Sequence, residues 1–252
     1  MNLLHAHIGR DGFRLRGVAM SRIDAFSDAV FAFALTLLVV SLEVPKGFAQ
    51  LQEAMAGFAP FAICFGVLLM IWYEHYKFFR RFGLHDLPTI VLNAVLLFLL
   101  LFYVYPLKFL CNLVIAQLMG NADAGRFSDP RQPVELMVLY GGGFAAIYLM
   151  IAALYWNGWR RREELDLNPL ERTLAKNYIV DAAGMAAIGL LSCALALALP
   201  VRLLALSGWA YLLIGVFKSV QGRRERRQAA ESRAQMPEED FQTRGVSDGV
   251  WA

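Results

Sequence analysis

The sequence predicts an all-α membrane protein with six transmembrane helices, and three observations carry this prediction. The chain has 252 residues, of which 58% are hydrophobic and only 18% are charged. Its charged residues cluster between long apolar blocks instead of being spread through them. Six of these blocks reach or approach the roughly 20 residues that a helix needs to cross a bilayer. A soluble domain of this length would bury a full core with a smaller apolar share.

The apolar blocks define the expected transmembrane helices. The first contains one acidic residue, Asp28, the next four are free of charge, and the sixth is short and bounded by Arg202 and Lys218. Pro200 separates the last two blocks, which are therefore expected to form a tight helical hairpin. In chain order, the expected helices are Ala25–Leu42, Ala54–Tyr73, Leu87–Leu107, Leu136–Trp159, Ala182–Val201 and Leu203–Phe217.

Lysine and arginine gather on one side of the expected membrane. They are frequent before the first helix, after the second, after the fourth and after the sixth, and sparse in the other loops. Because cytoplasmic loops carry an excess of Lys and Arg, both termini are expected in the cytoplasm. The chain then divides into a cytoplasmic arm (1–19), a six-helix domain (20–220) and a polar tail (221–252). The tail is predicted to be disordered beyond a short helical continuation.

Composition and motifs exclude several classes of function. A net charge of +3 gives little support to nucleic-acid binding, and the basic cluster in the tail is interpreted as membrane anchoring. The three cysteines have no paired or metal-ligand spacing, so they are interpreted as small buried hydrophobic residues. Neither a two-histidine metal motif nor a Gly-x-Ser-x-Gly elbow is present, so no enzyme is predicted. Membrane lipids are expected as partners, and no protein partner is inferred.

The first block has an apolar face and a separate polar corner when it is placed on a helix at 100° per residue. The apolar face combines five positions: Ala29, Phe33, Thr36, Leu37 and Val40. Ser27 and Asp28 lie about 120–140° from Phe33 by the same arithmetic. Because an isolated carboxylate in hydrocarbon costs several kcal/mol, Asp28 is expected to be hydrogen-bonded, paired or hydrated.

Partners for the polar corner are available on the next two helices. Trp72 and His75 are spaced i,i+3 and so share a helix face, and Asn93 is a lone amide in the third block. Together with Ser27 and Asp28 they are expected to form one interhelical polar network that locks the first helix in place. Each also has a simpler interpretation, since a lone Asn commonly joins helices and Trp or His near a membrane end is commonly an interface anchor.

The stretch from Arg22 to Asp28, RIDAFSD, resembles the RxxxFSD signature of the endolysosomal potassium channel (transmembrane protein 175) family, in its prokaryotic single-repeat members. Arg22 stands four residues before Phe26, and Ser27 and Asp28 complete the motif. Four later positions resemble the family's helix motifs: Trp72 and His75 in the second helix, Asn93 in the third, and Pro106 at the end of the third. The resemblance extends over the six-span pattern, roughly residues 20–220.

The resemblance implies a homotetramer in which the first helix of each subunit lines a central pore. The family lacks a Thr-Val-Gly-Tyr-Gly filter, and this sequence has none. The family's constriction is an Ile or Leu seven residues after the motif Phe, with a Thr three residues further; these positions are Phe33 and Thr36. Phe33 is therefore expected to be the gate, with the potassium path past Phe33 and Thr36. Leu37, Val40 and Ala29 are expected to line the rest of the pore.

The same resemblance assigns the polar corner a supporting role. Ser27, Asp28, Trp72, His75 and Asn93 would hold the pore helix, and Arg22 would stand at the cytoplasmic mouth. No cofactor is expected other than the permeant potassium ion, and the expected location is a prokaryotic plasma membrane. An alternative stays open at this point: a proton-coupled transporter or proton pathway using Asp28 and His75. The absence of an inverted repeat in the sequence disfavours it.

Overall fold

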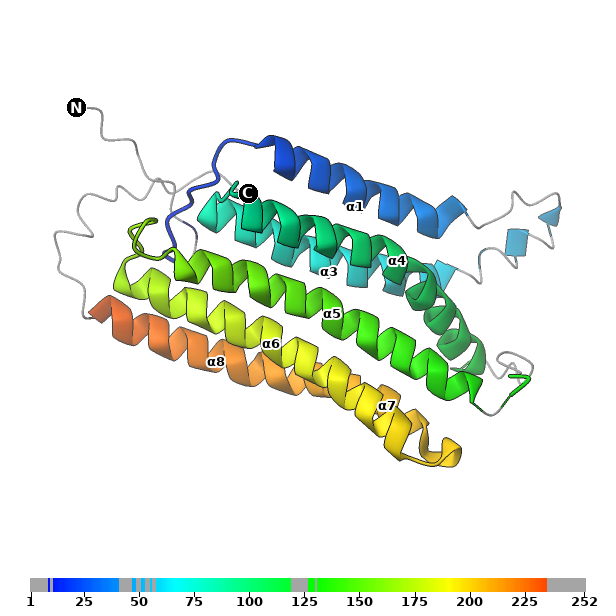
Figure 1. Ribbon diagram of the computed structural model, residues 1–252. Coiled ribbons are helices and arrows are strands. Elements are labelled where there is room, and N and C mark those ends of the chain that lie inside the picture. Colours follow the sequence, from blue (N-terminus) through cyan, green and yellow to red (C-terminus); the bar gives the residue numbers. More distant parts are fainter. Residues whose placement is uncertain are drawn as a thin grey trace.

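The structure, a computed structural model, describes residues 9, 11–40, 47–48, 51–52, 55, 58–118, 127–129 and 131–234. Every regular element in this part of the chain is helical, which confirms the predicted all-α class. The helices lie side by side in an elongated bundle, with α1 at one edge and α8 at the other (Figure 1). The longer helices are α1 (Arg22–Val40), α3 (Phe58–Phe82), α4 (Leu87–Leu118), α5 (Gln132–Arg160), α6 (Pro169–Ala198) and α8 (Leu213–Ala234).

Local sequence signals explain where several helices begin and end. Ser21 and Asp24 form a capping box at the start of α1, since the Asp24 carboxylate accepts from the Ser21 backbone N–H and the Ser21 hydroxyl accepts from the Asp24 backbone N–H. Asn168 and Glu171 do the same at the start of α6. Gly83, with a φ of +57°, ends α3 in the left-handed conformation that favours glycine.

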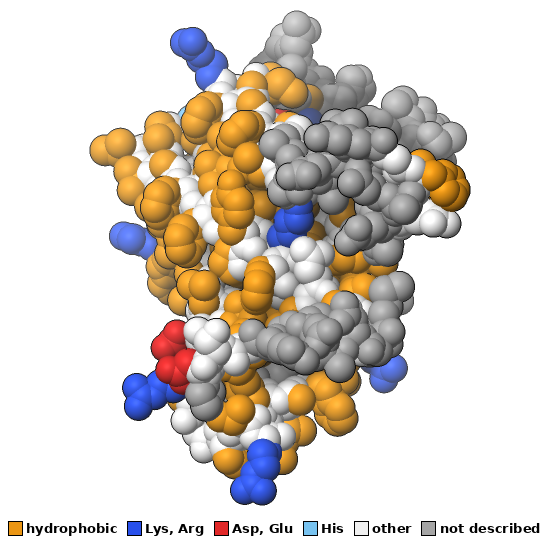
Figure 2. Space-filling model, turned by 90° about the vertical axis from the view of Figure 1, so that its right-hand side faces the viewer, with side chains coloured by type: hydrophobic (Ala, Val, Ile, Leu, Met, Phe, Trp, Pro, Cys, Tyr) orange, Lys and Arg blue, Asp and Glu red, His pale blue; other side chains and the backbone are white. Residues whose placement is uncertain are grey.

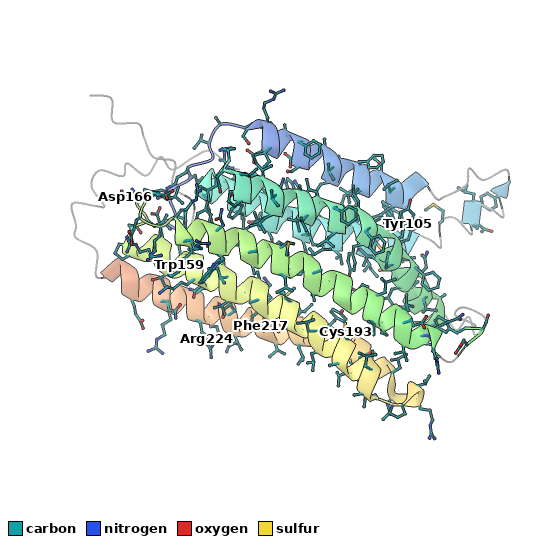
Figure 3. The ribbon with its side chains drawn as sticks, viewed as in Figure 1. Tyr105, Trp159, Asp166, Cys193, Phe217 and Arg224 are labelled. Atoms are coloured by element: carbon teal, nitrogen blue, oxygen red, sulfur yellow. The ribbon has the colours of Figure 1, made fainter. Side chains whose placement is uncertain are left out.

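The exterior of the bundle is apolar. Five described segments are long and apolar enough to cross a membrane, namely α3, α4, α5, α6 and the segment Val201–Glu225. α1 carries Arg22, Asp24 and Asp28 in its first two turns and is apolar from Ala29 onward except for Thr36. Hydrophobic side chains make up most of the described surface at the end of the bundle opposite the N-terminal arm (Figure 2). Trp159 and Tyr105 lie toward opposite ends (Figure 3), as in the aromatic belts of an integral membrane protein.

Several helices extend further than the apolar blocks predict, and α3, for example, continues past Tyr73 to Phe82. α4 continues through Pro106 to Leu118 and bends in its second half, so the prediction that Pro106 ends this helix is wrong (Figure 1). A transmembrane helix tolerates proline because neighbouring groups satisfy the freed backbone carbonyl. α6 begins at Pro169, well before Ala182, because polar residues continue its helix outside the apolar block. α8 runs to Ala234, past the expected domain limit at residue 220.

The predicted start of the second helix and the end of the first lie outside the described residues. The expected break between the last two helices is present: α6 ends at Ala198, and after Pro200 come η1 (Val201–Leu203), α7 (Ala205–Trp209) and η2 (Ala210–Leu212) before α8. This confirms the hairpin predicted from Pro200.

Glycines allow α5 and α6 to approach closely. A Cβ added to Gly141 would meet the Gly189 carbonyl oxygen at 2.9 Å, and one added to Gly189 would meet the Gly141 carbonyl oxygen at 2.9 Å. The backbones of α5 and α6 therefore touch at Gly141 and Gly189, a close approach that small residues permit at membrane helix interfaces. On α5, a Cβ at Gly143 would meet the Tyr103 ring at 2.6 Å, so this glycine makes room for the aromatic ring from α4.

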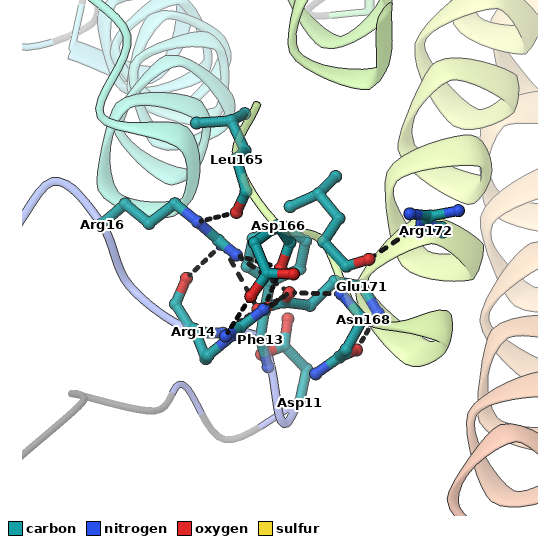
Figure 4. Close-up of polar contacts among 10 residues, drawn as sticks. Asp11, Phe13, Arg14, Arg16, Leu165, Asp166, Asn168, Glu171 and Arg172 are labelled. Carbon is teal, nitrogen blue, oxygen red and sulfur yellow. Dashed lines mark hydrogen bonds and ion pairs between the residues drawn. The ribbon is translucent and has the colours of Figure 1, made fainter. Parts of the chain in front are cut away.

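The N-terminal arm packs against the ends of α3 and α6 (Figure 4). The Phe13 ring is fully buried and meets the Phe82 ring edge-on, with centroids 5.4 Å apart. Glu171, also fully buried, accepts from the Arg14 backbone N–H at 2.8 Å and pairs with the guanidinium groups of Arg14 and Arg16, each at 3.0 Å. Since α1 follows directly, the arm fixes where this helix enters the bundle.

The arm also carries a titratable contact outside the membrane spans. Asp11 accepts hydrogen bonds from Tyr178 at 2.9 Å and from Arg81. Burial raises the pKa of Asp11, but the positive charge of Arg81 and the hydrogen bonds to the carboxylate outweigh burial and leave the pKa below its usual 3.8. Because the pKa is lower in the folded state, this contribution to stability is present above pH 3.8 and is lost as the pH falls through the folded-state value.

We therefore expect the unfolding temperature in detergent to fall on acidification below pH 4 more steeply in the parent protein than in an Asp11→Asn variant. The variant lacks the titrating carboxylate, and its unfolding temperature is already lower at pH 7. The measurement is a thermal melt at pH values between 7 and 3. If the unfolding temperature depends on pH in the same way in both proteins, the Asp11 carboxylate does not contribute to the pH dependence of stability.

Candidate functional site: the first helix and its polar contacts

A buried chain of hydrogen bonds joins α1, α4 and α3. The Asn93 amide nitrogen donates to Ser27 Oγ at 2.9 Å, and Ser27 Oγ donates to the Ile23 carbonyl at 2.7 Å. His75 Nε2 lies 2.8 Å from Asn93 Oδ1. Because Asn93 Oδ1 is an acceptor in this arrangement, His75 Nε2 carries the proton. Ser27, His75 and Asn93 are at most 2% exposed, so water does not reach their polar atoms. These atoms therefore depend on one another for hydrogen bonds, and the loss of one partner would leave a buried polar group unsatisfied.

A second, separate contact holds Asp28. The Trp72 indole Nε1 donates to Asp28 Oδ1 at 2.8 Å. Trp72 is half-buried, and its ring stacks on Tyr76 with centroids 5.5 Å apart. A hydrogen bond from a neutral donor stabilises the carboxylate without bringing in a second charge. Trp72 and His75 share the face of α3 that meets α1, so the five residues that the sequence groups together come together as two hydrogen-bonded sets.

The opposite side of α1 is not covered by any other described part of the chain. Phe33 is 56% exposed and Phe26 62%, although both are large hydrophobic side chains. Ala29 and Thr36 are exposed as well, and the Thr36 hydroxyl donates to the Phe33 carbonyl at 2.7 Å. Leu37 is half-buried and packs against the core instead. Val40 lies in the last turn of α1, and its side chain falls outside the described part of the structure.

The uncovered face of α1 has no acidic side chain that could bind a cation. It consists of phenyl rings, methyl groups and the Thr36 hydroxyl, and Arg22 is exposed at the first turn of the helix. Within the described residues there is no group of three or more His, Cys, Asp or Glu side chains that could hold a metal ion. The face is therefore suited to a hydrophobic constriction with adjacent hydroxyl groups rather than to tight ion binding.

Sequence reasoning missed three contacts that position α1. The Lys108 ammonium donates to the Leu38 carbonyl at 2.7 Å and so holds the far end of the helix. Asp24, in the capping box, and the pairing of the arm with Glu171 hold the near end. The two capping boxes were readable from the spacing of Ser21 with Asp24 and of Asn168 with Glu171. No comparable pattern marks Lys108.

Comparison with known proteins identifies the family. The model of the family described as endosomal/lysosomal potassium channel TMEM175 matches residues 22–103, a range that includes α1, α3 and about half of α4. A protein of Marivirga tractuosa named "Potassium channel" is 41% identical over 222 residues, covering 84% of this chain and 90% of the relative. The chain belongs to the TMEM175 family.

Further TMEM175-like proteins agree in sequence and fold. A protein of Chamaesiphon minutus named as a potassium channel is 28% identical over 153 residues, covering 58% of this chain and 66% of the relative. The crystal structure of a variant of the potassium channel MtTMEM175, in complex with a nanobody–MBP fusion protein, superposes with a TM-score of 0.78 at 39% identity, covering 88% of this chain and all of that one. The TMEM175 homologue from Chamaesiphon minutus shares the fold, with a TM-score of 0.53, 24% identity, and coverage of 79% of this chain and 96% of that one.

The family assignment confirms the resemblance drawn from RIDAFSD and from the positions of Trp72, His75 and Asn93. All of these residues lie inside the matched range. Since TMEM175 proteins are channels, the assignment also agrees with the prediction that the chain is not an enzyme.

Proposed function

We propose that this integral membrane protein is a potassium-permeable cation channel in which four copies of the chain arrange α1 around a central pore. The observation that carries the proposal is the asymmetry of α1: hydrogen bonds fasten one side to α3 and α4, while Phe33 and Thr36 stand uncovered on the other. Exposed apolar side chains on the other helices face lipid, but the exposed face of α1 also carries Arg22 and the Thr36 hydroxyl, and polar groups in a membrane favour a water-filled path over lipid. We assign potassium as the permeant ion because the relatives are named as potassium channels.

In this proposal Phe33 is the gate and Thr36 the ring that contributes to selectivity. Rings of phenyl groups at a constriction exclude water and so block ions until they move apart. The Thr36 hydroxyl donates its proton to the Phe33 carbonyl, which leaves its oxygen lone pairs free to face a cation. Ala29 and Val40 would line the ion path on either side of Phe33, whereas Leu37, which the sequence also assigned to the pore, packs against the core. No cofactor is proposed besides the permeant potassium ion.

The polar contacts have a fastening role in this proposal. Asp28 is hydrogen-bonded to Trp72 and His75 to Asn93, so the carboxylate and the imidazole belong to different hydrogen-bonded sets. A proton relay from Asp28 to His75 would need a link between the two sets. The transporter alternative is therefore kept as one outcome of the test below.

The membrane orientation follows from charge. The arm, the end of α3, the region around the end of α5 and the last part of α8 carry most of the described arginines, and they lie together at one end of the bundle (Figure 1). By the positive-inside rule this end faces the cytoplasm, and both termini with it, in the plasma membrane of a prokaryote.

The decisive experiment measures potassium flux from proteoliposomes containing the purified protein, with Phe33→Ala beside the parent. We expect the variant to conduct roughly tenfold faster without a counter-gradient, which corresponds to a barrier lower by about 1.4 kcal/mol. Phe98→Ala is the matched control, because Phe98 is 69% exposed on α4 and not on α1. Its flux is expected to equal that of the parent.

Two results would contradict the proposal. Equal flux in Phe33→Ala and Phe98→Ala would place the gate elsewhere. No potassium flux in any of the proteins, together with proton uptake that disappears in a His75→Ala variant, would establish the transporter alternative instead.

A further inference from the structure

Two cations lie beside one aromatic ring where α5 ends and α6 begins. The Arg162 guanidinium lies 4.4 Å from the centroid of the Trp159 ring, and the Lys176 ammonium lies 5.5 Å from the same centroid. Trp159 directly precedes a run of three arginines in the sequence. It lies toward the end of the bundle that carries the N-terminal arm (Figure 3). This ring therefore marks the level at which an interfacial tryptophan meets lipid headgroups.

The chain provides little negative charge for these two cations. Among the described residues, the one acidic partner of Arg162 is Glu163 at 3.5 Å, and the Glu163 side chain is 78% exposed. Lys176 is exposed, and its ammonium has no acidic partner within the described ranges. An aromatic face attracts a cation only weakly at an exposed site. Most N–H donors of the two groups are therefore available to an anion.

An apolar surface continues from the cations into the membrane. On α6, Val180 follows Lys176 by four residues, so it lies on the same face, one turn closer to the middle of the bilayer. On α5, Trp156 lies one turn closer to the middle of the bilayer than Trp159, and the two rings stack with centroids 5.3 Å apart. Trp156 is 50% exposed and Val180 is 51% exposed. A ligand bound here would meet positive charge at one end and an apolar surface at the other.

We propose that Arg162, Lys176 and the two tryptophans form a binding site for one anionic phospholipid, such as phosphatidylglycerol, in the leaflet next to the N-terminal arm. The headgroup phosphate lies between the guanidinium and the ammonium group, and the acyl chains lie along Trp156 and Val180. Arginine and lysine both donate charge-assisted hydrogen bonds to phosphate oxygens. Basic sites between transmembrane helices at this level fit anionic headgroups.

A specific site has to be distinguished from general attraction by a basic surface. Arg223 and Arg224 are exposed on α8 at the same end of the bundle, and within the described part of the chain neither lies over an aromatic ring or pairs with an acid. If positive charge alone attracts anionic lipid, removing either pair of cations weakens binding equally. A double variant with Arg223→Gln and Arg224→Gln is therefore the matched control for one with Arg162→Gln and Lys176→Gln.

The test titrates the purified full-length protein in neutral detergent with phosphatidylglycerol and counts bound lipids by native mass spectrometry. We expect the affinity to fall about tenfold or more in the double variant of Arg162 and Lys176, and by less than about twofold in the control. Phosphatidylcholine has no net charge and should bind weakly to the parent and to both variants. Equal losses in the two double variants, or equal binding of the two lipids to the parent, would overturn the proposal.

A single Lys176→Gln variant covers the case in which Arg162→Gln disturbs the turn after α5. Lys176 is exposed, so we expect this variant to melt at the temperature of the parent and still to bind phosphatidylglycerol about threefold more weakly. Parent-like affinity in this variant would remove Lys176 from the site and overturn the proposal.

Inorganic phosphate separates a lipid site from a site for a free anion. Phosphate shares the charge of the headgroup but has no acyl chains, so an excess of phosphate at constant ionic strength should leave phosphatidylglycerol bound to the parent. Displacement of the lipid by phosphate would assign the site to a soluble anion and overturn the lipid assignment. These measurements need no potassium flux, so their outcome is independent of the proposed channel function.

Discussion

A Glu171→Gln variant is expected to unfold at a markedly lower temperature than the parent protein, with a loss of about 3 kcal/mol in stability. Glu171 is a fully buried carboxylate that faces two guanidinium groups, each with one N–O distance of 3.0 Å. Glutamine keeps the shape of the side chain but removes the counter-charge of Arg16 and leaves Arg14 with only the exposed Asp166, 3.5 Å away. Since these arginines keep 28% and 18% of their side-chain exposure, the loss falls at the low end for broken buried ion pairs.

The matched control for this variant is Glu163→Gln. Glu163 pairs with Arg162 at 3.5 Å, but its side chain is 78% exposed. Water screens such a pair, and we expect a change of about 0.5 kcal/mol or less. Thermal melts of both variants in detergent make the comparison. Similar melting temperatures for the two would show that the ion pairs of Glu171 do not stabilise the packing of the arm on α3 and α6.

Limited trypsin digestion gives an independent readout of the arm. Arg14 and Arg16 are cleavage sites that the packed arm protects, because the Arg16 and Gly17 backbone N–H groups donate to the Arg81 and Arg80 carbonyls. In Glu171→Gln we expect faster cleavage within the arm at a temperature where the helices remain folded. Unchanged protection would mean that backbone pairing and the buried Phe13 ring hold the arm without the ion pairs.

The helices could be predicted because a bilayer-spanning segment must be apolar over a fixed length, and polar residues within it must find partners. This reasoning selected Ser27, Asp28, Trp72, His75 and Asn93, and the structure brings all five into contact. It did not separate them into two sets. Ser27 and Asp28 are adjacent, so their side chains point about 100° apart and meet different helices.

The arm could not be predicted in the same way. Its residues are polar and show no period, and its contacts are long-range: Arg14 and Glu171 are 157 positions apart. Charge alone indicates a cytoplasmic segment, but which acid pairs with which arginine depends on where α6 begins. That start lies outside the apolar block, at a capping box formed by Asn168 and Glu171. The extension of α4 past Pro106 was missed because proline favours a helix end in the absence of tertiary contacts.

An Asn93→Ala variant is expected to lower stability by about 3 kcal/mol, because it removes the central member of a buried hydrogen-bonded chain. His75 would keep a buried ring N–H without an acceptor, and Ser27 would lose its donor. Asn112→Ala is the matched control on the same helix, since Asn112 is exposed. We expect its melting temperature to stay close to that of the parent. The measurement is again a thermal melt in detergent.

A double-mutant cycle with Ser27→Ala separates the hydrogen bond between α1 and α4 from general packing. If Asn93 and Ser27 act together, the double variant should be more stable than the sum of the two single losses predicts, with a coupling of about 1 kcal/mol. Strict additivity would mean that each residue acts through other neighbours. The hydrogen bonds from Ser27 through Asn93 to His75 hold α1 against α3 and α4. If the double variant loses stability in a coupled way, we therefore also expect it to leak potassium faster from proteoliposomes. A coupled loss of stability with unchanged flux would show that Trp72 and Lys108 alone suffice to position the pore helix.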